Sequence, residues 1–237
     1  MLSIGLGGPS AELVDRAHRA STKVMVMVTS VDEAVAMERI GVDVIVAQGT
    51  EAGGHRSHLR EPRPGERSGL GTMTLVPEVA EAVRCPVAAA GGIVDGRGLA
   101  AALTLGAAGV LMGSRFVATQ EAIAPEVHKK AVLERTGTDT AVTESWSGWP
   151  ARAVANEYVR RYEATSSPAL PFPLQYVASS DISTAAIDRN DLEHVPLWAG
   201  QGIGRIQDLP WAADVVESVV AEARRVLLEE VPSRVAL

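Results

Sequence analysis

A histidine that directly follows a glycine pair is the clearest candidate for chemistry in this sequence. Residues 49–55 read GTEAGGH and come directly after an apolar run, so that Gly53 and Gly54 precede His55. An imidazole titrates near neutral pH, and it can therefore take a proton from a carbon acid. Glycines let the backbone approach a ligand closely. His55 is thus a candidate general base, and the alternative is a polar residue that merely ends a turn.

Two more glycine blocks, each at the end of an apolar run, are candidates for binding a phosphate. Gly91 and Gly92 follow one run, and Gly113 and Ser114 follow the next. Backbone N–H groups at such turns, together with the Ser114 hydroxyl, can donate hydrogen bonds to a phosphate dianion. The loops after the last two strands of a (β/α)₈ barrel are a common phosphate site. The alternative is that these glycines only turn the chain.

The elements that position these turns alternate between strands and helices. Apolar strand-like runs are separated by segments with helical spacing of apolar residues, a pattern typical of a parallel sheet covered by helices. A closed barrel needs eight strands, and this pattern predicts only about five. The predicted strands are residues 2–6, 23–28, 43–48, 86–90 and 109–112.

Polar residues mark where the predicted helices begin. Ser10 and Asp95 are expected to cap two of them, and Ser30 with Glu33 forms a possible capping box for another. Pro77 is expected near the first turn of the helix that follows residues 56–71. These signals agree with the helix positions that a βα alternation requires.

The second half of the chain gives a weaker pattern. After Phe116 the sequence is helical and irregular, so residues 120–237 are expected to form a mostly helical C-terminal part of one domain that spans residues 1–237. Trp146, Trp149 and Trp198 lie in this half; they could cover a ligand, but we expect them mainly to pack.

Composition limits the class of protein. The chain has 237 residues, close to the length of one (β/α)₈ barrel, and 46% of them are hydrophobic. Its net charge of −7 argues against a nucleic-acid surface. Cys85 is the single cysteine, which excludes a disulfide framework, and we expect no metal site. No leader pattern at residues 1–10 and no apolar run of membrane-spanning length is visible, so a cytoplasmic location is expected.

Three spaced motifs and a fourth near the C-terminus resemble the nitronate monooxygenases, formerly called 2-nitropropane dioxygenases. They are GTEAGGH at 49–55, AAGGIVDGRG at 89–98, MGSRF at 112–116 and LWAGQG at 197–202. The resemblance implies an FMN-dependent flavoprotein that oxidises alkyl nitronates or nitroalkanes with molecular oxygen, with His55 as catalytic base. It also implies that FMN is contacted by Gln48, Gly53, Gly91, Gly92, Leu111, Met112, Gly113 and Ser114.

Compared with that family, the sequence matches from about the fourth strand onward. The expected fold is therefore an N-terminally shortened TIM-type (β/α) barrel with a C-terminal helical segment. A fragment, a misassigned start and a naturally shortened paralogue are three explanations that the sequence leaves open. An open sheet exposes strand edges, so self-association into a homo-oligomer is expected. Met27 stands where relatives often have a polar residue facing the flavin ring, which places flavin affinity in question.

Two other functions fit the same motifs. An FMN-dependent enoyl-acyl-carrier-protein reductase shares the glycine–histidine turn and the phosphate blocks. A shortened, inactive paralogue, either flavin-binding or merely structural, would keep the fold without turnover. NADH oxidation with a crotonyl thioester would favour the first, and failure to take up FMN would favour the second.

Overall fold

The computed structural model describes residues 1–60, 69–165 and 167–235. Within this part the chain divides into two compact units, each assembled from separate stretches of sequence. The first unit comprises Met1–Thr50, Ser57–Met112 and Val216–Leu237, and the second comprises Glu51–Arg56 and Gly113–Val215.

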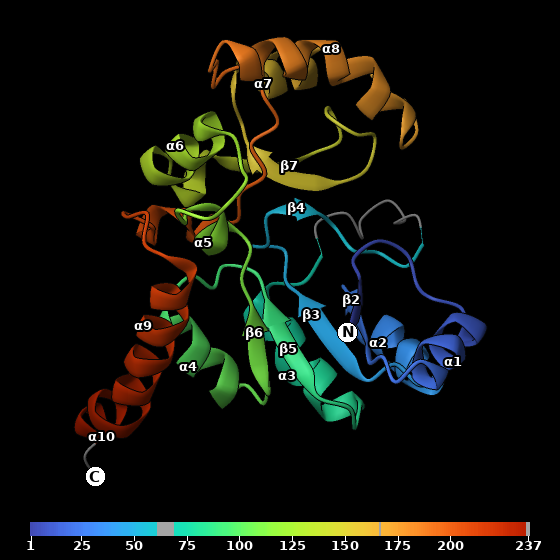
Figure 1. Cartoon of the computed structure of the whole chain (residues 1–237), viewed down its shortest axis with the longest axis vertical. Helices are drawn as coiled ribbons and strands as arrows, with labels where there is room; N and C mark the ends of the chain where they lie inside the picture. The colour runs from blue at the N-terminus through green and yellow to red at the C-terminus, as the bar shows by residue number, and fades with distance from the viewer. Residues whose placement is uncertain (61–68, 166, 236–237) are drawn as a thin grey trace. The chain divides into compact units, whose positions relative to one another are not determined.

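The first unit is built on a five-stranded parallel sheet (Figure 1). Its strand order is β1-β2-β3-β5-β6, and every neighbouring pair runs parallel. The five predicted strands are confirmed, and each begins and ends within two residues of its predicted bounds. They are β1 (Leu2–Ile4), β2 (Val24–Val28), β3 (Val44–Gln48), β5 (Val87–Ala90) and β6 (Gly109–Leu111).

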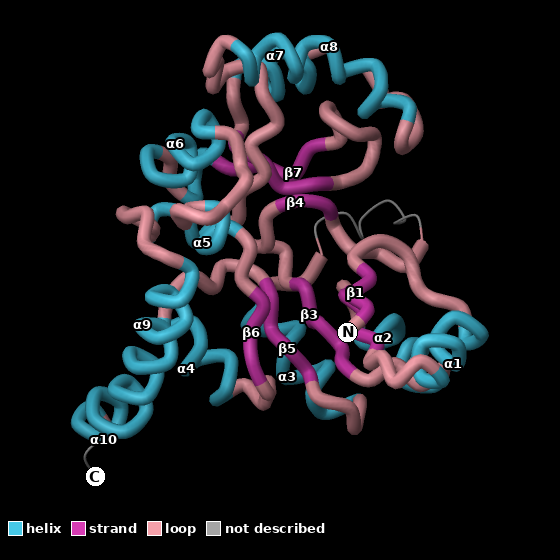
Figure 2. Tube along the Cα trace, viewed as in Figure 1, coloured by secondary structure: helices cyan, strands magenta, loops and turns pink. Residues whose placement is uncertain are grey.

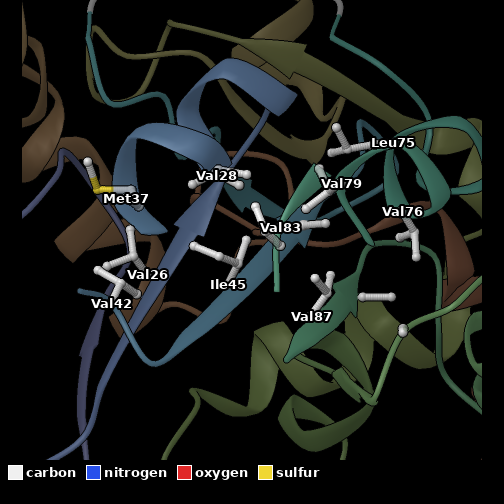
Figure 3. Packing of buried hydrophobic residues seen from close by; sticks show 14 of the residues in the cluster. Val26, Val28, Met37, Val42, Ile45, Leu75, Val76, Val79, Val83 and Val87 are labelled. Atoms are coloured by element: carbon white, nitrogen blue, oxygen red, sulfur yellow. The ribbon is translucent and has the colours of Figure 1, made fainter. Parts of the chain in front are cut away.

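The main core lies between one face of this sheet and four helices, α1 (Ala11–Arg19), α2 (Val31–Arg39), α3 (Thr72–Ala82) and α4 (Gly96–Thr104). Alternate residues of β2, such as Val26 and Val28, point to this face and are fully buried. Figure 3 shows them with Ile45 of β3 and with Val79 of α3. Burying such side chains contributes about 1.5–3 kcal/mol each, so this face fixes the register of the sheet.

The predicted helix caps are largely confirmed. The side chains of Ser10 and Asp95 accept hydrogen bonds from backbone N–H groups at the starts of α1 and α4 (Gly96–Thr104). Ser30 caps α2, but the Glu33 carboxylate accepts from the N–H of Thr29 rather than from that of Ser30. The capping box is therefore shifted by one residue, which ties the end of β2 to the start of α2.

The helix predicted after residues 56–71 is confirmed, but Pro77 lies further along it than expected. The helix α3 begins at Thr72, with Gly71 as its N-cap, so Pro77 lies inside the helix rather than near its first turn. The residues Leu75 and Val76 are fully buried, so a full turn of helix before Pro77 packs into the core. Apolar packing of this first turn outweighs the loss of one N–H donor at the proline.

A C-terminal helix, α9 (Ala212–Arg225), packs against α4 from Val216 onward (Figure 2). A Cβ atom at Gly96 would come within 2.5 Å of the backbone nitrogen of Ala223, so only glycine permits this contact. The Gly96 N–H also donates to the Glu222 carboxylate at 2.8 Å. The chain continues as one π-helical turn, η4 (Val226–Glu230), and a short helix, α10 (Val231–Arg234).

The second unit contains an antiparallel sheet that sequence patterns do not predict. Its strand order is β4-β8-β7, with β4 (Gly54–His55), β8 (Ala151–Val154) and β7 (Thr140–Thr143). A two-residue strand carries too little alternation to be recognised. The same unit holds α5 (Ser114–Val117), α6 (Glu126–Glu134), α7 (Glu157–Ala164) and α8 (Leu174–Asp188), with the 3₁₀ turns η2 (Gly137–Asp139) and η3 (Gln201–Arg205). None of the helices in the described residues combines the length and apolarity that crossing a membrane requires.

Candidate functional site

In the first unit, the carboxyl ends of three neighbouring strands bring several candidate residues together. The register pairs Gln48 of β3 with Ala90 of β5, and Ala90 with Leu111 of β6. These three side chains share the sheet face opposite the main core, because residues paired in register point to the same side. Gly91, Gly92 and Met112 follow these strand ends directly in the chain. Ligands of parallel α/β sheets bind at this edge.

The Gly91–Gly92 turn has a backbone that only glycine adopts without strain. Their φ angles are +122° and +70°, in the region that L side chains rarely occupy. The carbonyl of Gly91 accepts a hydrogen bond from the Thr72 hydroxyl at 3.0 Å. This bond fixes the turn against the first residue of α3. The glycines are thus required by the backbone itself, and the fixed turn is compatible with donation of N–H groups to a phosphate.

Gln48 has a structural partner at this edge. Its side chain is 3% exposed, and its carbonyl oxygen accepts a hydrogen bond from the N–H of Ser57 at 3.0 Å. Met27 of β2 is half-buried and points to the same sheet face as Gln48. It pairs with Val46 of β3, two residues before Gln48. Gln48 therefore holds the chain segment just after His55 in addition to any contact with a cofactor.

In the second unit, the glycine turn before His55 packs directly on the LWAGQG segment. A Cβ atom at Gly53 would lie 2.5 Å from both the Ala199 carbonyl carbon and the Gly200 nitrogen. The N–H of Gln201 donates to the Glu51 carbonyl at 2.9 Å, and that of Gly200 donates to the Ser114 hydroxyl at 3.0 Å. Gly53 and Ser114, distant in sequence, are thus joined through residues 199–201. The glycine at position 53 has a packing reason that is independent of any ligand.

His55 is held by a hydroxyl and flanked by aromatic rings. Its Nε2 atom lies 2.9 Å from Ser147 Oγ, in a pair that can form a hydrogen bond in either direction. The rings of Trp198 and Phe172 have centroids 5.2 Å and 6.0 Å from the imidazole. Burial lowers the pKa of His55 below its usual value, because desolvation disfavours the charged imidazolium. The imidazole is therefore neutral at pH 7, which is the form that can accept a proton.

Gly113 and Ser114 also belong to the second unit, at the start of α5. A Cβ atom at Gly113 would meet no described atom within 4 Å, so protein packing does not require glycine there. The Ser114 oxygen accepts a hydrogen bond from Gly200, which leaves its own proton available to an anion. The next residue, Arg115, is anchored by the Asp208 carboxylate at 2.7 Å and by two backbone carbonyls. A phosphate approaching the N–H groups of residues 113 and 114 fits this arrangement.

Sequence reasoning missed two residues of this site, Ser147 and Phe172, and gave too little weight to Trp198. Ser147 lies in a stretch that has no motif, and its proximity to His55 depends on the pairing of β4 with β8. Phe172 and Trp198 reach His55 from segments far away in sequence. Trp146, by contrast, is 2% exposed and stacks on Tyr158, as expected for a packing role.

Comparison with known proteins adds independent information. The model of the nitronate monooxygenase family matches residues 1–222. A probable nitronate monooxygenase of Staphylococcus aureus strain Newman is 40% identical over 195 residues, which is 82% of this chain and 55% of that protein. The homologue in strain MSSA476 is 37% identical over 221 residues, or 93% of this chain and 62% of that protein. The chain thus spans somewhat more than half the length of these relatives.

Two solved structures have the same fold. Nitroalkane oxidase from Streptomyces ansochromogenes superposes with a TM-score of 0.87 and 37% identity over 95% of this chain and 65% of that one. FabK from Thermotoga maritima gives 0.83 and 32%, over 98% and 70%. The expected α/β fold, related to TIM-barrel members of these families, is therefore confirmed. With the family model matching nearly its whole length, the chain belongs to the nitronate monooxygenase family.

Proposed function

We propose that this chain takes part in the FMN-dependent oxidation of alkyl nitronates and nitroalkanes by molecular oxygen. One observation carries the proposal beyond family membership. His55 is a neutral imidazole with its Nε2 fixed on Ser147, directly after the glycine turn. A base poised in this way suits removal of a proton from the carbon next to a nitro group.

The proposal assigns one group of residues to the FMN phosphate and a second group to the remainder of the cofactor. When bound, the flavin would accept electrons from the nitronate and pass them to oxygen. Backbone N–H groups at the Gly91–Gly92 turn and at Gly113, with the Ser114 hydroxyl, are the donors proposed for its phosphate. The proposed contacts of the remainder of the cofactor are Gln48, Gly53, Leu111 and Met112. For Gly53 the close packing on residues 199–200 supports an indirect role, through the shape of the turn.

His55 does the proton chemistry in this proposal. Its neutral form accepts the α-proton of a nitroalkane, and the resulting imidazolium can be stabilised by the Ser147 oxygen as a hydrogen-bond acceptor. A preformed nitronate has already lost that proton and does not need the base. Neutral and ionised substrates therefore separate proton abstraction from the later oxidation.

A second candidate function is reduction of an enoyl thioester with NADH. It is favoured by the similarity to FabK, which covers 98% of this chain. A third candidate is an inactive paralogue that binds flavin weakly or is merely structural, for which the apolar Met27 is the supporting observation. The three differ in what the purified chain does with each substrate.

The test uses the full chain with added FMN. We expect oxygen uptake with the nitronate of 1-nitropropane and no NADH oxidation with a crotonyl thioester. NADH oxidation without nitronate turnover would replace the proposal by the reductase. FMN binding is measured separately by equilibrium dialysis, with an expected dissociation constant in the micromolar range, a binding free energy of about −8 kcal/mol. An absence of both FMN binding and turnover would support the inactive paralogue.

We also propose that the chain self-associates. The terminal strands of the five-stranded sheet are β1 and β6, and a terminal strand presents backbone groups that can pair with another chain. Light scattering is expected to report a dimer or larger species. A stable, monodisperse monomer would contradict this.

A further inference from the structure

Aromatic side chains form a cluster beside His55 in the second unit. The Trp198 ring is tilted by 41° to the imidazole, and the Phe172 ring meets it edge-on at 74°. Trp149 extends the cluster, with its ring centroid 6.2 Å from that of Phe172. Because Phe172 is 45% exposed, the cluster is not sealed within a core. A substrate group that lies beside the imidazole can therefore contact aromatic surface.

The nearest charged residue of the same sheet points away from this cluster. In the β4–β8 register, Ala151 is opposite His55 and Arg152 is opposite Gly54. Successive side chains of a strand alternate between faces, so Arg152 projects from the face opposite His55. Its guanidinium donates to the Thr140 hydroxyl on the neighbouring strand at 3.0 Å. The groups recorded beside His55 thus include the Trp198 and Phe172 rings and the Ser147 hydroxyl, and Arg152 projects from the other face of the sheet.

We propose that Trp198 and Phe172 select substrates whose reacting carbon bears an apolar substituent, either an aryl group or an alkyl chain of about four or more carbons. This inference rests on the proposed function, because it takes the substrate carbon to lie within reach of His55. Each methylene buried against the rings strengthens binding by about 0.8 kcal/mol at most, or roughly fourfold. A substituent that ends in a carboxylate loses affinity, since the faces of aromatic rings are negative and a carboxylate is costly to desolvate.

Two measurements test the selection separately from the chemistry. Calorimetric titration of the full chain without FMN compares binding of nitroethane, 1-nitrohexane and 3-nitropropionate, and it does not depend on turnover. Oxygen uptake with FMN gives kcat/KM for the three corresponding nitronates. We expect 1-nitrohexane to exceed nitroethane by about tenfold or more in both measurements, allowing for partial burial of the added methylenes. We expect 3-nitropropionate to be the poorest of the three.

Substitutions assign the preference to the cluster. Phe172→Ala is expected to reduce the ratio of 1-nitrohexane to nitroethane by about fivefold, and Phe172→Leu is expected to restore part of it. Tyr176→Ala removes an aromatic ring that is 57% exposed on α8, and it serves as the control with an unchanged ratio.

The outcomes are distinct from those for the proposed function. A chain that binds 1-nitrohexane preferentially but turns over no nitronate would retain the selection and reject the chemistry. Nitronate turnover with equal values for all three substrates, or with a preference for 3-nitropropionate, would overturn the inference. An unchanged ratio in Phe172→Ala would also overturn it.

Discussion

The contact between Gly53 and the LWAGQG segment predicts that Gly53→Ala destabilises the folded chain. The added Cβ atom would lie 2.5 Å from two backbone atoms, at Ala199 and Gly200. Ordinary van der Waals contact begins near 3.4 Å, so the two segments must separate by about 0.9 Å. Backbone atoms cannot move aside as the end of a flexible side chain can. The substitution therefore strains the turn that precedes His55.

The expected cost follows from what the separation disturbs. Overpacking of this kind costs about 1–3 kcal/mol, and one weakened hydrogen bond adds about 1 kcal/mol. The hydrogen bonds at risk are Gln201 N–H to the Glu51 carbonyl and Gly200 N–H to the Ser114 hydroxyl. A total of about 2–4 kcal/mol corresponds to a fall in Tm of about 5–15 °C for a chain of this size.

Thermal unfolding followed by circular dichroism measures this fall. Gly113→Ala is the matched control, because a Cβ atom there meets no described atom within 4 Å and the φ angle is −101°. Its Tm should change by less than about 2 °C, as expected for substitutions away from packed contacts. The same control should weaken FMN binding, because its added Cβ would hinder close approach of the phosphate to the backbone N–H that Gly113 and alanine share.

An unchanged Tm in Gly53→Ala would contradict the predicted loss of stability. The prediction also fails if both variants lose FMN affinity equally while neither loses stability. The first result would mean that the contact with residues 199–200 is not formed in solution. The second would return Gly53 to the direct cofactor contact that the family resemblance implies.

Three more predictions concern His55 and its neighbours. His55→Asn should reduce turnover of neutral nitroalkanes by about 10²–10⁴-fold while sparing preformed nitronates, as measured by oxygen uptake, and equal losses on both forms would assign His55 to binding. Burial lowers the pKa of His55, so the folded state binds fewer protons than the unfolded state. The free energy of unfolding should therefore fall as the pH drops below about 6.5. Urea titrations at pH 7.5 and 5.5 measure this fall, which should be smaller in His55→Asn than in the original chain. Ser147→Ala should lower kcat for neutral nitroalkanes by about tenfold through loss of ring orientation, with a smaller effect on nitronates, and an unchanged kcat would mean that Ser147 does not position the base.

The sheet of the first unit could be predicted because its signal is local. Parallel strands buried on both faces read as continuous apolar runs, and 24–28 and 44–48 are such runs. Ser10 and Asp95 indicate two helix starts, because a capping side chain accepts a hydrogen bond from a backbone N–H only three residues later. The position of Pro77 inside α3 could not be predicted, because a proline is a strong local signal for a helix start, whereas burial of Leu75 depends on the whole core.

The second unit could not be read in the same way. Its sheet pairs residues 54–55 with 151–152, across almost one hundred positions, and β4 has no periodicity of its own. His55 was found through a motif, but its partner Ser147 is one serine among many. Phe172 and Trp198 are brought to it by the fold alone. A sequence motif identifies the candidate base, whereas only tertiary structure identifies what surrounds it.

The close approach of Gly53 and Gly200 has a consequence for how this sequence can diverge. The contact is reciprocal, because a Cβ atom at Gly200 would lie 2.8 Å from the Glu51 carbonyl oxygen and 3.0 Å from the Gly53 nitrogen. Because Gly53 and Gly200 are already the smallest residue, no substitution at one position can make room for a larger residue at the other. A library that randomises both positions should therefore recover glycine at each one independently, with no compensating pair. Methods that detect contacts from correlated substitutions would then not detect this contact, because neither position varies. The contact nevertheless joins the turn before His55 to the C-terminal motif.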